Sequence, residues 1–234
     1  MTRLTITHPL LGTVDITLKP GVGRFTGRWR NGTAQITAPQ GASRQAIARA
    51  VDSLAPRMLP SKPRQAYVTP QRIECHGVTF VLSTQSHKPD AILARPRLPE
   101  TTVAIGSEID LSTTEGTATV SRMLCRLASR LAEPLLIPYA EQIADRLGIR
   151  PAQWRIASGH RVLGSCSSNR VIRLSYLLVF LPLELRQYII CHELAHLTEM
   201  NHSPRFHELC NAYCNGYERE LAAHLKSFNW PILR

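Results

Sequence analysis

No stretch of this 234-residue sequence approaches the roughly 18 consecutive apolar residues that a membrane-spanning helix requires. The first 20 residues have no apolar core of the kind found in secretory signal peptides, because Thr, His and Asp interrupt the apolar positions. The six cysteines are irregularly spaced over a long chain, which is unlike the disulfide framework of a small secreted domain. These absences predict a cytoplasmic protein with reduced thiols and no membrane segment.

Acidic residues are scarce: 17 Asp and Glu stand against 28 Lys and Arg, which gives a net charge of +11. Apolar residues make up 44% of the chain and charged residues 19%, the usage of a folded globular protein. We expect weak, salt-sensitive binding of nucleic acid if these charges gather on one face of the fold. No run of consecutive basic residues marks a tail, so a basic surface that only keeps the protein soluble is the simpler interpretation.

Apolar and polar residues alternate through the N-terminal half of the chain with the period of half-buried strands. Asn31-Gly32 is a strong hairpin signal, and Ser43 is a good N-cap for a helix that Pro56 ends. The pattern predicts a β-rich region with one helix over residues 1–115.

Helical periodicity dominates residues 116–234, which we expect to form a compact second domain. Pro134 and Pro138 are expected to kink or break its first long helix. Another helix is predicted from Pro182, and a last one over residues 204–225. Together the two halves predict an α+β fold.

The motif His-Glu-Leu-Ala-His, which begins at His192, carries the clearest chemical signal. His192 and His196 are four residues apart on a predicted helix, so their imidazoles leave one face about a turn apart, as two ligands of one ion would. Glu193 lies beside them and suits the role of general base toward a water that the metal activates. His202 follows a predicted turn. Three nitrogen ligands and one open position are the composition of a catalytic zinc site.

Other candidate ligands follow in the sequence. His207 lies on the next predicted helix, where Cys210 and Cys214 are four residues apart and form a candidate thiolate pair. Core cysteines on an amphipathic helix are the commoner explanation of that pair. Glu199 and Glu208 are candidates for carboxylates that orient a metal-binding histidine.

Two predicted strands, Trp154–Ala157 and Val171–Leu174, flank a Gly-Ser-Cys-Ser-Ser turn at residues 164–168. A turn this short and flexible would let a substrate backbone approach the metal, although a plain hairpin connection explains it as well. The strand at residues 171–174 is expected to pair with an extended substrate. The candidate substrate-lining residues are Gly164, Ser165, Cys166 and Arg173.

These motifs resemble the YgjP-like metallopeptidase domain, a relative of the SprT-like and WLM minimal zincins. The similarity is strong over about residues 160–210 and rests on the histidine motif, on the Gly-Ser-Cys-Ser-Ser segment, and on Asn201-His202-Ser203 with Phe206. It is weak over most of the remaining chain. The resemblance implies a zincin-like domain in which three histidines bind zinc and Glu193 is the general base; the three are His192, His196 and His202.

The chain departs from the family pattern at two places. Val162-Leu163 stands where the family usually has Arg-Trp, and His207 stands where the family has Trp after Phe206. These differences concern substrate contacts rather than the metal ligands.

The expected activity is therefore zinc-dependent hydrolysis of a peptide or protein. A metal-dependent nucleoside triphosphate pyrophosphatase is one alternative, because Arg161, Arg170, Arg173 and the basic charge suit a nucleotide, although no glycine-rich phosphate loop is present. A nucleic-acid-associated protein with a structural metal is another, and it needs Cys210 or Cys214 as a fourth ligand.

Overall fold

The computed structural model describes residues 2–30, 33–59, 67–159 and 162–233, which form an α+β fold. The contacts divide the chain into two compact units. Unit 1 comprises Met1–Tyr67, Asp110–Ser121 and Leu233–Arg234, and unit 2 comprises Val68–Ile109 and Arg122–Ile232. Residues 68–109 thus cluster with the unit that carries the histidine motif. The assignment of residues 116–234 as a separate zincin-like domain stays a prediction.

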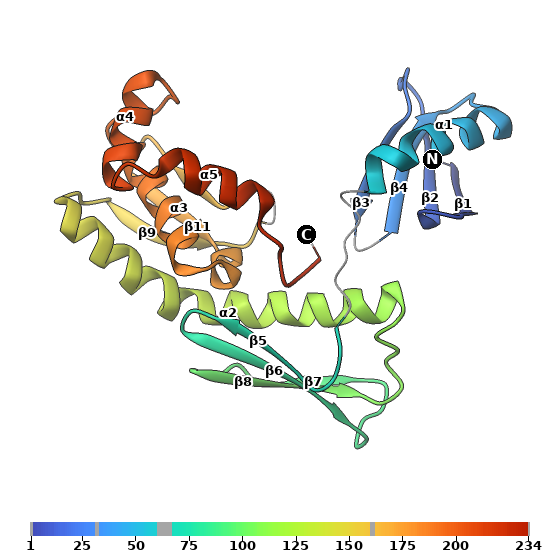
Figure 1. Ribbon diagram of the computed structural model, residues 1–234, viewed down its shortest axis with the longest axis horizontal. Helices are drawn as coiled ribbons and strands as arrows, with labels where there is room; N and C mark the ends of the chain where they lie inside the picture. Colours follow the sequence, from blue (N-terminus) through green and yellow to red (C-terminus); the bar gives the residue numbers. More distant parts are fainter. Residues whose placement is uncertain (1, 31–32, 60–66, 160–161, 234) are drawn as a thin grey trace. The chain divides into compact units, whose positions relative to one another are not determined.

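Unit 1 is a four-stranded sheet with one helix on one of its faces (Figure 1). Its strands lie in the order β1-β2-β4-β3, and only β2 and β4 run parallel. The helix α1 packs its Ile47 and Val51 against inward-facing strand residues such as Ile16 and Ile36. The elements are β1 (Thr2–His8), β2 (Gly12–Lys19), β3 (Thr26–Arg30), β4 (Thr33–Pro39) and α1 (Arg44–Met58).

The start of α1 is as predicted, since the Ser43 side chain accepts a hydrogen bond from the backbone N–H of Ala46. Its end is not, because the helix continues through Pro56. Ala55 and Met58 remain buried in the core of the unit, so packing holds the last turn. The predicted hairpin residues Asn31-Gly32 lie outside the described residues.

Unit 2 contains two sheets. The first has the order β5-β6-β8-β7 and is built from β5 (Gln71–Cys75), β6 (Val78–Gln85), β7 (Ile92–Ala94) and β8 (Glu100–Gly106). The second has the order β10-β11-β9 and is built from β9 (Gln153–Ala157), β10 (Gly164–Cys166) and β11 (Val171–Ser175). In this sheet β11 pairs antiparallel with β10 and parallel with β9.

The long helix α2 (Thr114–Leu147) begins in unit 1 and continues in unit 2. Pro134 and Pro138 were expected to kink or break this helix; it remains continuous, and Figure 1 shows it change direction along its course, which agrees with a kink but not with a break. Buried residues lie on both sides of the prolines, among them Leu131, Leu136 and Ile143, so packing keeps the helix continuous. Neither α2 nor any other described helix is apolar over enough of its length to cross a membrane.

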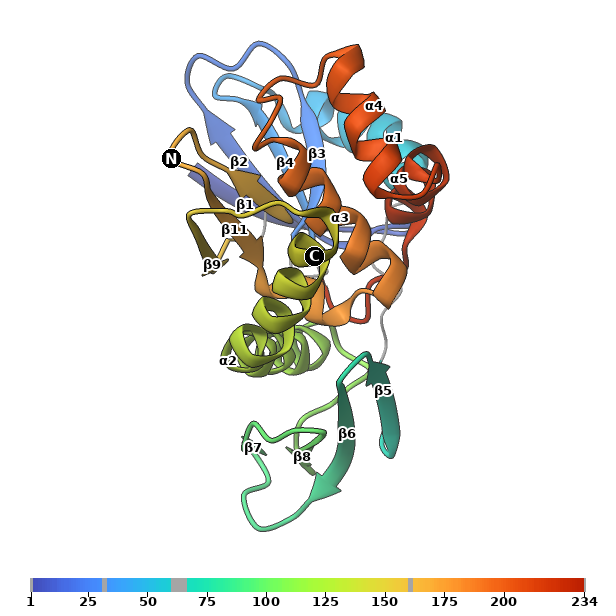
Figure 2. The same cartoon turned by 90° about the vertical axis from the view of Figure 1, so that its left-hand side faces the viewer.

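The helix α3 (Leu183–Ala195) carries the histidine motif and follows a 3-10 helix, η2 (Tyr176–Phe180). It packs against β10 and β11 on one side and against two further helices, α4 (Pro204–Tyr213) and α5 (Glu218–Ser227), as Figures 1 and 2 show. One last helix was predicted here, but Asn215 and Gly216 adopt positive φ angles of 54° and 90° and divide it.

Candidate metal centre

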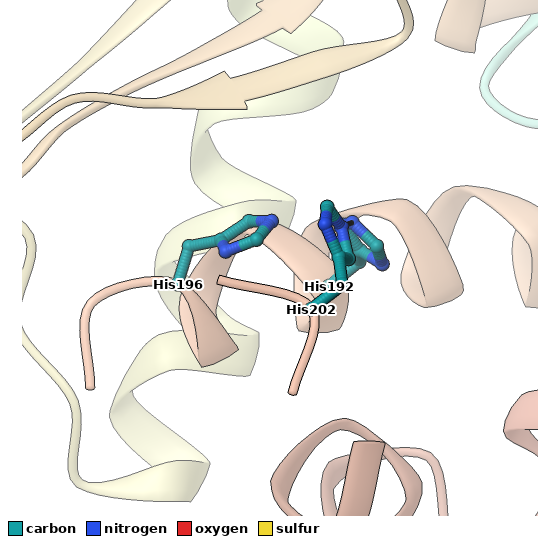
Figure 3. Close-up of side chains that lie close together, drawn as sticks. All are labelled: His192, His196 and His202. Atoms are coloured by element: carbon teal, nitrogen blue, oxygen red, sulfur yellow. Dashed lines mark hydrogen bonds between the residues drawn. The ribbon is translucent and has the colours of Figure 1, made fainter. Parts of the chain in front are cut away.

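Three histidine side chains converge in unit 2 (Figure 3). His192 and His196 leave the same face of α3, and His202 comes from the loop before α4. One nitrogen from each lies within 4.8 Å of the others, and no other group of three such ligands occurs among the described residues. The Nε2 atoms of His192 and His202 are 3.1 Å apart. Two nitrogens bound tetrahedrally to one zinc would be about 3.3 Å apart, so the donor set fits a metal ion.

Local structure brings the third histidine back to the first two. The helix α3 ends at Ala195, and tight backbone hydrogen bonds then reverse the chain, among them the bond from Thr198 N to Ala195 O. Ser203 restarts helical structure as the N-cap of α4 by accepting from the backbone N–H of Phe206. This short reversal places His202 against the last turn of α3.

The ring of His196 is fixed by a backbone group. Its Nδ1 lies 3.1 Å from the carbonyl oxygen of Glu199 and must donate to it, since a carbonyl only accepts. The lone pair of Nε2 is thereby left for a metal. The sequence pointed to the Glu199 carboxylate for this role, but the main chain of the residue performs it.

The electrostatic environment keeps His192 and His196 in their metal-binding form. Burial, with smaller contributions from neighbouring histidines, lowers the pKa of His192 to about 4. Burial also lowers the pKa of His196, while the hydrogen bond to Glu199 partly opposes that shift. Both imidazoles are therefore neutral at pH 7, as metal ligation requires.

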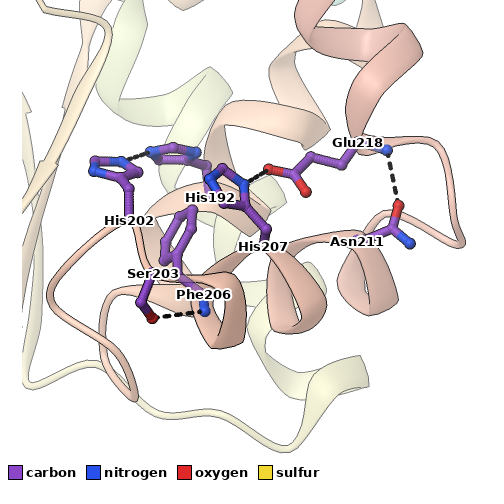
Figure 4. A network of polar contacts seen from close by, with 7 residues as sticks. All are labelled: His192, His202, Ser203, Phe206, His207, Asn211 and Glu218. Atoms are coloured by element: carbon purple, nitrogen blue, oxygen red, sulfur yellow. Dashed lines mark hydrogen bonds and ion pairs between the residues drawn. The ribbon is translucent and has the colours of Figure 1, made fainter.

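Phe206 forms an apolar wall beside the three rings, two of which, those of His192 and His202, are drawn with it in Figure 4. Its ring stacks on His196 with centroids 4.4 Å apart and meets His192 and His202 edge-on at 4.8 and 4.7 Å. An apolar contact on all three ligands limits their rotation and excludes water from that side of the site.

Glu193 is only 5% exposed, and its Oε2 atom has no hydrogen-bond partner among the described residues. Burial raises the pKa of this carboxyl to about 8. A buried carboxylate without a partner is costly, and it becomes favourable when a cation lies nearby. This orphaned oxygen is a second, independent sign that the site is built for a metal.

Gly164 lies directly against Glu193. A side-chain methyl at this glycine would lie 2.6 Å from Cγ and 2.7 Å from Cδ of Glu193, which is too close for any real contact. The absence of a side chain at residue 164 therefore allows the carboxyl group to occupy its buried position. Sequence analysis singled out this glycine, but not its contact with Glu193.

The first three residues of the turn predicted at 164–168 instead form the strand β10, and the turn lies at residues 167–170. Ser165 pairs with Arg173, so both point away from the face on which Gly164 meets Glu193. Arg173 is therefore not brought to the histidines. The pKa of Cys166 is raised by burial and by Glu193, which does not favour a nucleophilic thiolate.

The position of β11 contradicts its predicted pairing with substrate. It is the central strand, with β10 and β9 bonded to its two edges, so no edge remains for a third partner. The two outer edges of this sheet belong to β10 and β9, and β10 is the strand that carries Gly164. Backbone hydrogen bonds join Leu163 to Ser175 and Ser167 to Val171. Because only every second residue of an antiparallel strand bonds to its partner, the backbone N–H and C=O groups of Gly164 and Cys166 face away from β11.

The other candidate ligands lie outside the histidine cluster. Nδ1 of His207 is 2.8 Å from a carboxylate oxygen of Glu218, and its ring centroid is 6.4 Å from that of His202 (Figure 4). Cys214 exchanges side-chain hydrogen bonds with Cys191 and Cys210 instead of approaching the histidines. Glu208 lines a hollow of about 540 Å³ together with His207 and Glu218.

Comparison with known families agrees with this geometry. A model of the YgjP-like, metallopeptidase domain matches residues 28–228, most of the chain. The chain belongs to the YgjP-like family. The YgjP-like match begins in β3 and ends just after α5, and membership implies a hydrolase that uses a metal ion. Comparisons with curated proteins and with solved structures gave no match.

Proposed function

We propose that this YgjP-like protein is a zinc metallopeptidase in which His192, His196 and His202 hold the ion and Glu193 is the general base. The observation that carries the proposal is the orphaned, buried oxygen of Glu193, which follows His192 in the chain, together with the convergence of three imidazoles. When bound, zinc supplies Lewis-acid chemistry, which polarises a carbonyl group and lowers the pKa of water toward about 7.

Glu193 would move the protons of the reaction. Its free Oε2 is available to accept a proton from the attacking water and to deliver it to the leaving amine. Burial brings the pKa of the carboxyl to about 8, so both protonation states are accessible near neutral pH. The Phe206 ring would shield this exchange from bulk water on one side.

The edge of β10 would orient the substrate. An extended peptide that adds to this edge would bond to the outward-facing backbone groups of Gly164 and Cys166. Because Gly164 also touches Glu193, such a peptide would run past the base. This edge supports peptides, rather than nucleotides, as substrates.

The pyrophosphatase alternative has less support. The Arg170 guanidinium donates to the backbone carbonyls of Arg150 and Leu197, Arg173 points away from the Glu193 face, and Arg161 lies outside the described residues. A hollow of about 850 Å³ that includes Arg95 and Arg97 contains none of the three histidines.

The test is to load the purified protein with zinc and to measure cleavage of casein. Glu193→Gln should retain its zinc but lose at least about 10²-fold in turnover, because the amide cannot accept the proton. His196→Ala should lose zinc and activity together.

Elemental analysis of each variant separates the two roles. Full zinc content in His196→Ala would refute the ligand assignment, and full turnover in Glu193→Gln would refute the base. Hydrolysis of nucleoside triphosphates, but not of casein, by the zinc-loaded protein would favour the pyrophosphatase.

A further inference from the structure

The positive charge of the chain is concentrated in its N-terminal part. Residues 1–67 contain ten Lys or Arg but only two Asp or Glu, a net charge of +8 out of the total of +11. The remaining 167 residues carry only +3. Neither the metal centre nor the proposed peptidase chemistry makes use of this concentration.

One face of the unit 1 sheet is open. Alternation along the strands sends the apolar side chains toward α1 and the polar ones to the opposite face. We call the latter the open face; its residues are Arg3, Thr5, Thr7, Thr13, Asp15, Thr17, Lys19, Thr26, Arg28, Arg30, Thr33, Gln35 and Thr37.

Strand register places the three arginines of the open face on its edge strands, while Lys19 lies at the end of the inner strand β2. Arg28 and Arg30 lie two residues apart on the edge strand β3, and Arg3 lies on the opposite edge strand, β1. All three are exposed, and no ion-pair partner for any of them occurs in the described parts of the chain. The one carboxylate on the face, Asp15, lies on β2 and accepts a hydrogen bond from Thr5.

We propose that the open face binds the phosphate backbone of a nucleic-acid duplex without sequence preference. Arginines, hydroxyls and an amide are the groups that contact phosphate oxygens in such complexes. The face carries seven threonines and Gln35 between its arginines, so hydrogen-bond donors are available across its whole width.

The chemistry of the face argues against other partners. Single strands are held by stacking on aromatic rings, but Phe25 and Trp29 pack into the core on the α1 side. A protein partner would need aromatic or aliphatic anchors, and none of the open-face residues is of either type. A flat, polar and basic surface instead fits a dense, regular array of phosphates.

The test measures binding of the full-length protein to a random-sequence DNA duplex over a range of salt concentrations. The test variant, Arg3→Gln/Arg28→Gln/Arg30→Gln, removes the three arginines of the open face. Each neutralised phosphate adds about 0.9 to the steepness with which log affinity falls against log salt concentration. Because the variant lacks three arginines, its slope should be shallower by about 2.7. Between roughly 50 and 200 mM salt, the affinity of the wild type should therefore fall about 40-fold more than the affinity of the variant.

A matched control removes the same charge from the other side of unit 1. Arg44→Gln/Arg49→Gln/Arg57→Gln alters three exposed residues of α1, and its salt slope should stay close to that of the wild type. An equal loss of slope in both triple variants would overturn the proposal, because the attraction would then be diffuse.

A second variant guards against misfolding of the first. Asp15→Asn removes the carboxylate from the open face and should tighten duplex binding, a gain that an unfolded unit cannot produce. Unchanged or weaker binding by Asp15→Asn would contradict the proposal. So would tighter binding of a single strand of equal length, or equal competition by polyglutamate at the same charge concentration.

Discussion

The buried carboxyl of Glu193 makes the stability of the metal-free protein depend on pH. Its pKa is about 8 in the folded protein, against an ordinary value of 4.5 that we take for the unfolded chain. Because the folded value is the higher one, the stabilisation is complete below pH 4.5 and is lost as pH rises through 8. Replacing Glu193 with Gln removes this dependence but keeps the shape of the side chain.

The window from pH 6.5 to 8 isolates this effect. The depressed pKa values of His192 and His196 cost stability only as pH falls below 6.5. Within the window, the wild type should lose roughly 1.5 kcal/mol of unfolding free energy relative to Glu193→Gln, since each pH unit below the folded pKa is worth about 1.4 kcal/mol.

The assay is urea denaturation of both proteins after removal of metal, at pH 6.5, 7, 7.5 and 8, followed by circular dichroism. Other titrating groups are the same in the two proteins and cancel in the difference. Two curves that stay parallel across the window would refute the argument that Glu193 is buried without a compensating partner. Added zinc should reduce the difference, because a cation stabilises the ionised carboxylate.

Two further substitutions test the packing around the site. Gly164→Ala should keep zinc but lower casein turnover by about 10²-fold, since the new methyl displaces Glu193 from its position; unchanged turnover would contradict the contact. Arg186→Met should destabilise the protein by about 3 kcal/mol or more in urea, because the guanidinium, 1% exposed, donates to backbone carbonyls of η2 and its flanking residue that would be left unpaired. A loss below about 1 kcal/mol would show that water replaces the arginine.

The parts of the site that the sequence predicted are those set by local geometry. Two histidines four residues apart on a helix must share a face, and a polar segment ending in Ser203-Pro204 must interrupt the helix before another begins. These rules predicted that His202 lies near His192 and His196 without any knowledge of the tertiary fold. The N-cap at Ser43 was predicted on the same basis.

The parts that the sequence did not predict depend on contacts between distant segments. From the sequence alone, Gly164 is interpreted as a turn residue. The structure places it in a strand, where its close approach to Glu193, 29 positions later, explains the glycine. Pro134 and Pro138 weaken a helix locally, but the packing of neighbouring residues outweighs their cost. Neither the contact between Gly164 and Glu193 nor the balance between proline and packing in α2 can be predicted from composition or periodicity alone.

Glu193 connects stability with function in this protein. A carboxyl oxygen that is buried and unpartnered in the metal-free chain lowers the stability at neutral pH, and a glutamine or an apolar residue would avoid that cost. Gly164 lies directly against this carboxyl, and Glu193 follows His192, one of the three histidines whose ring nitrogens converge. A solely structural metal would require the imidazoles but not this acid. The burial of Glu193 is therefore the main support for our proposal that the site transfers protons rather than holding a structural metal.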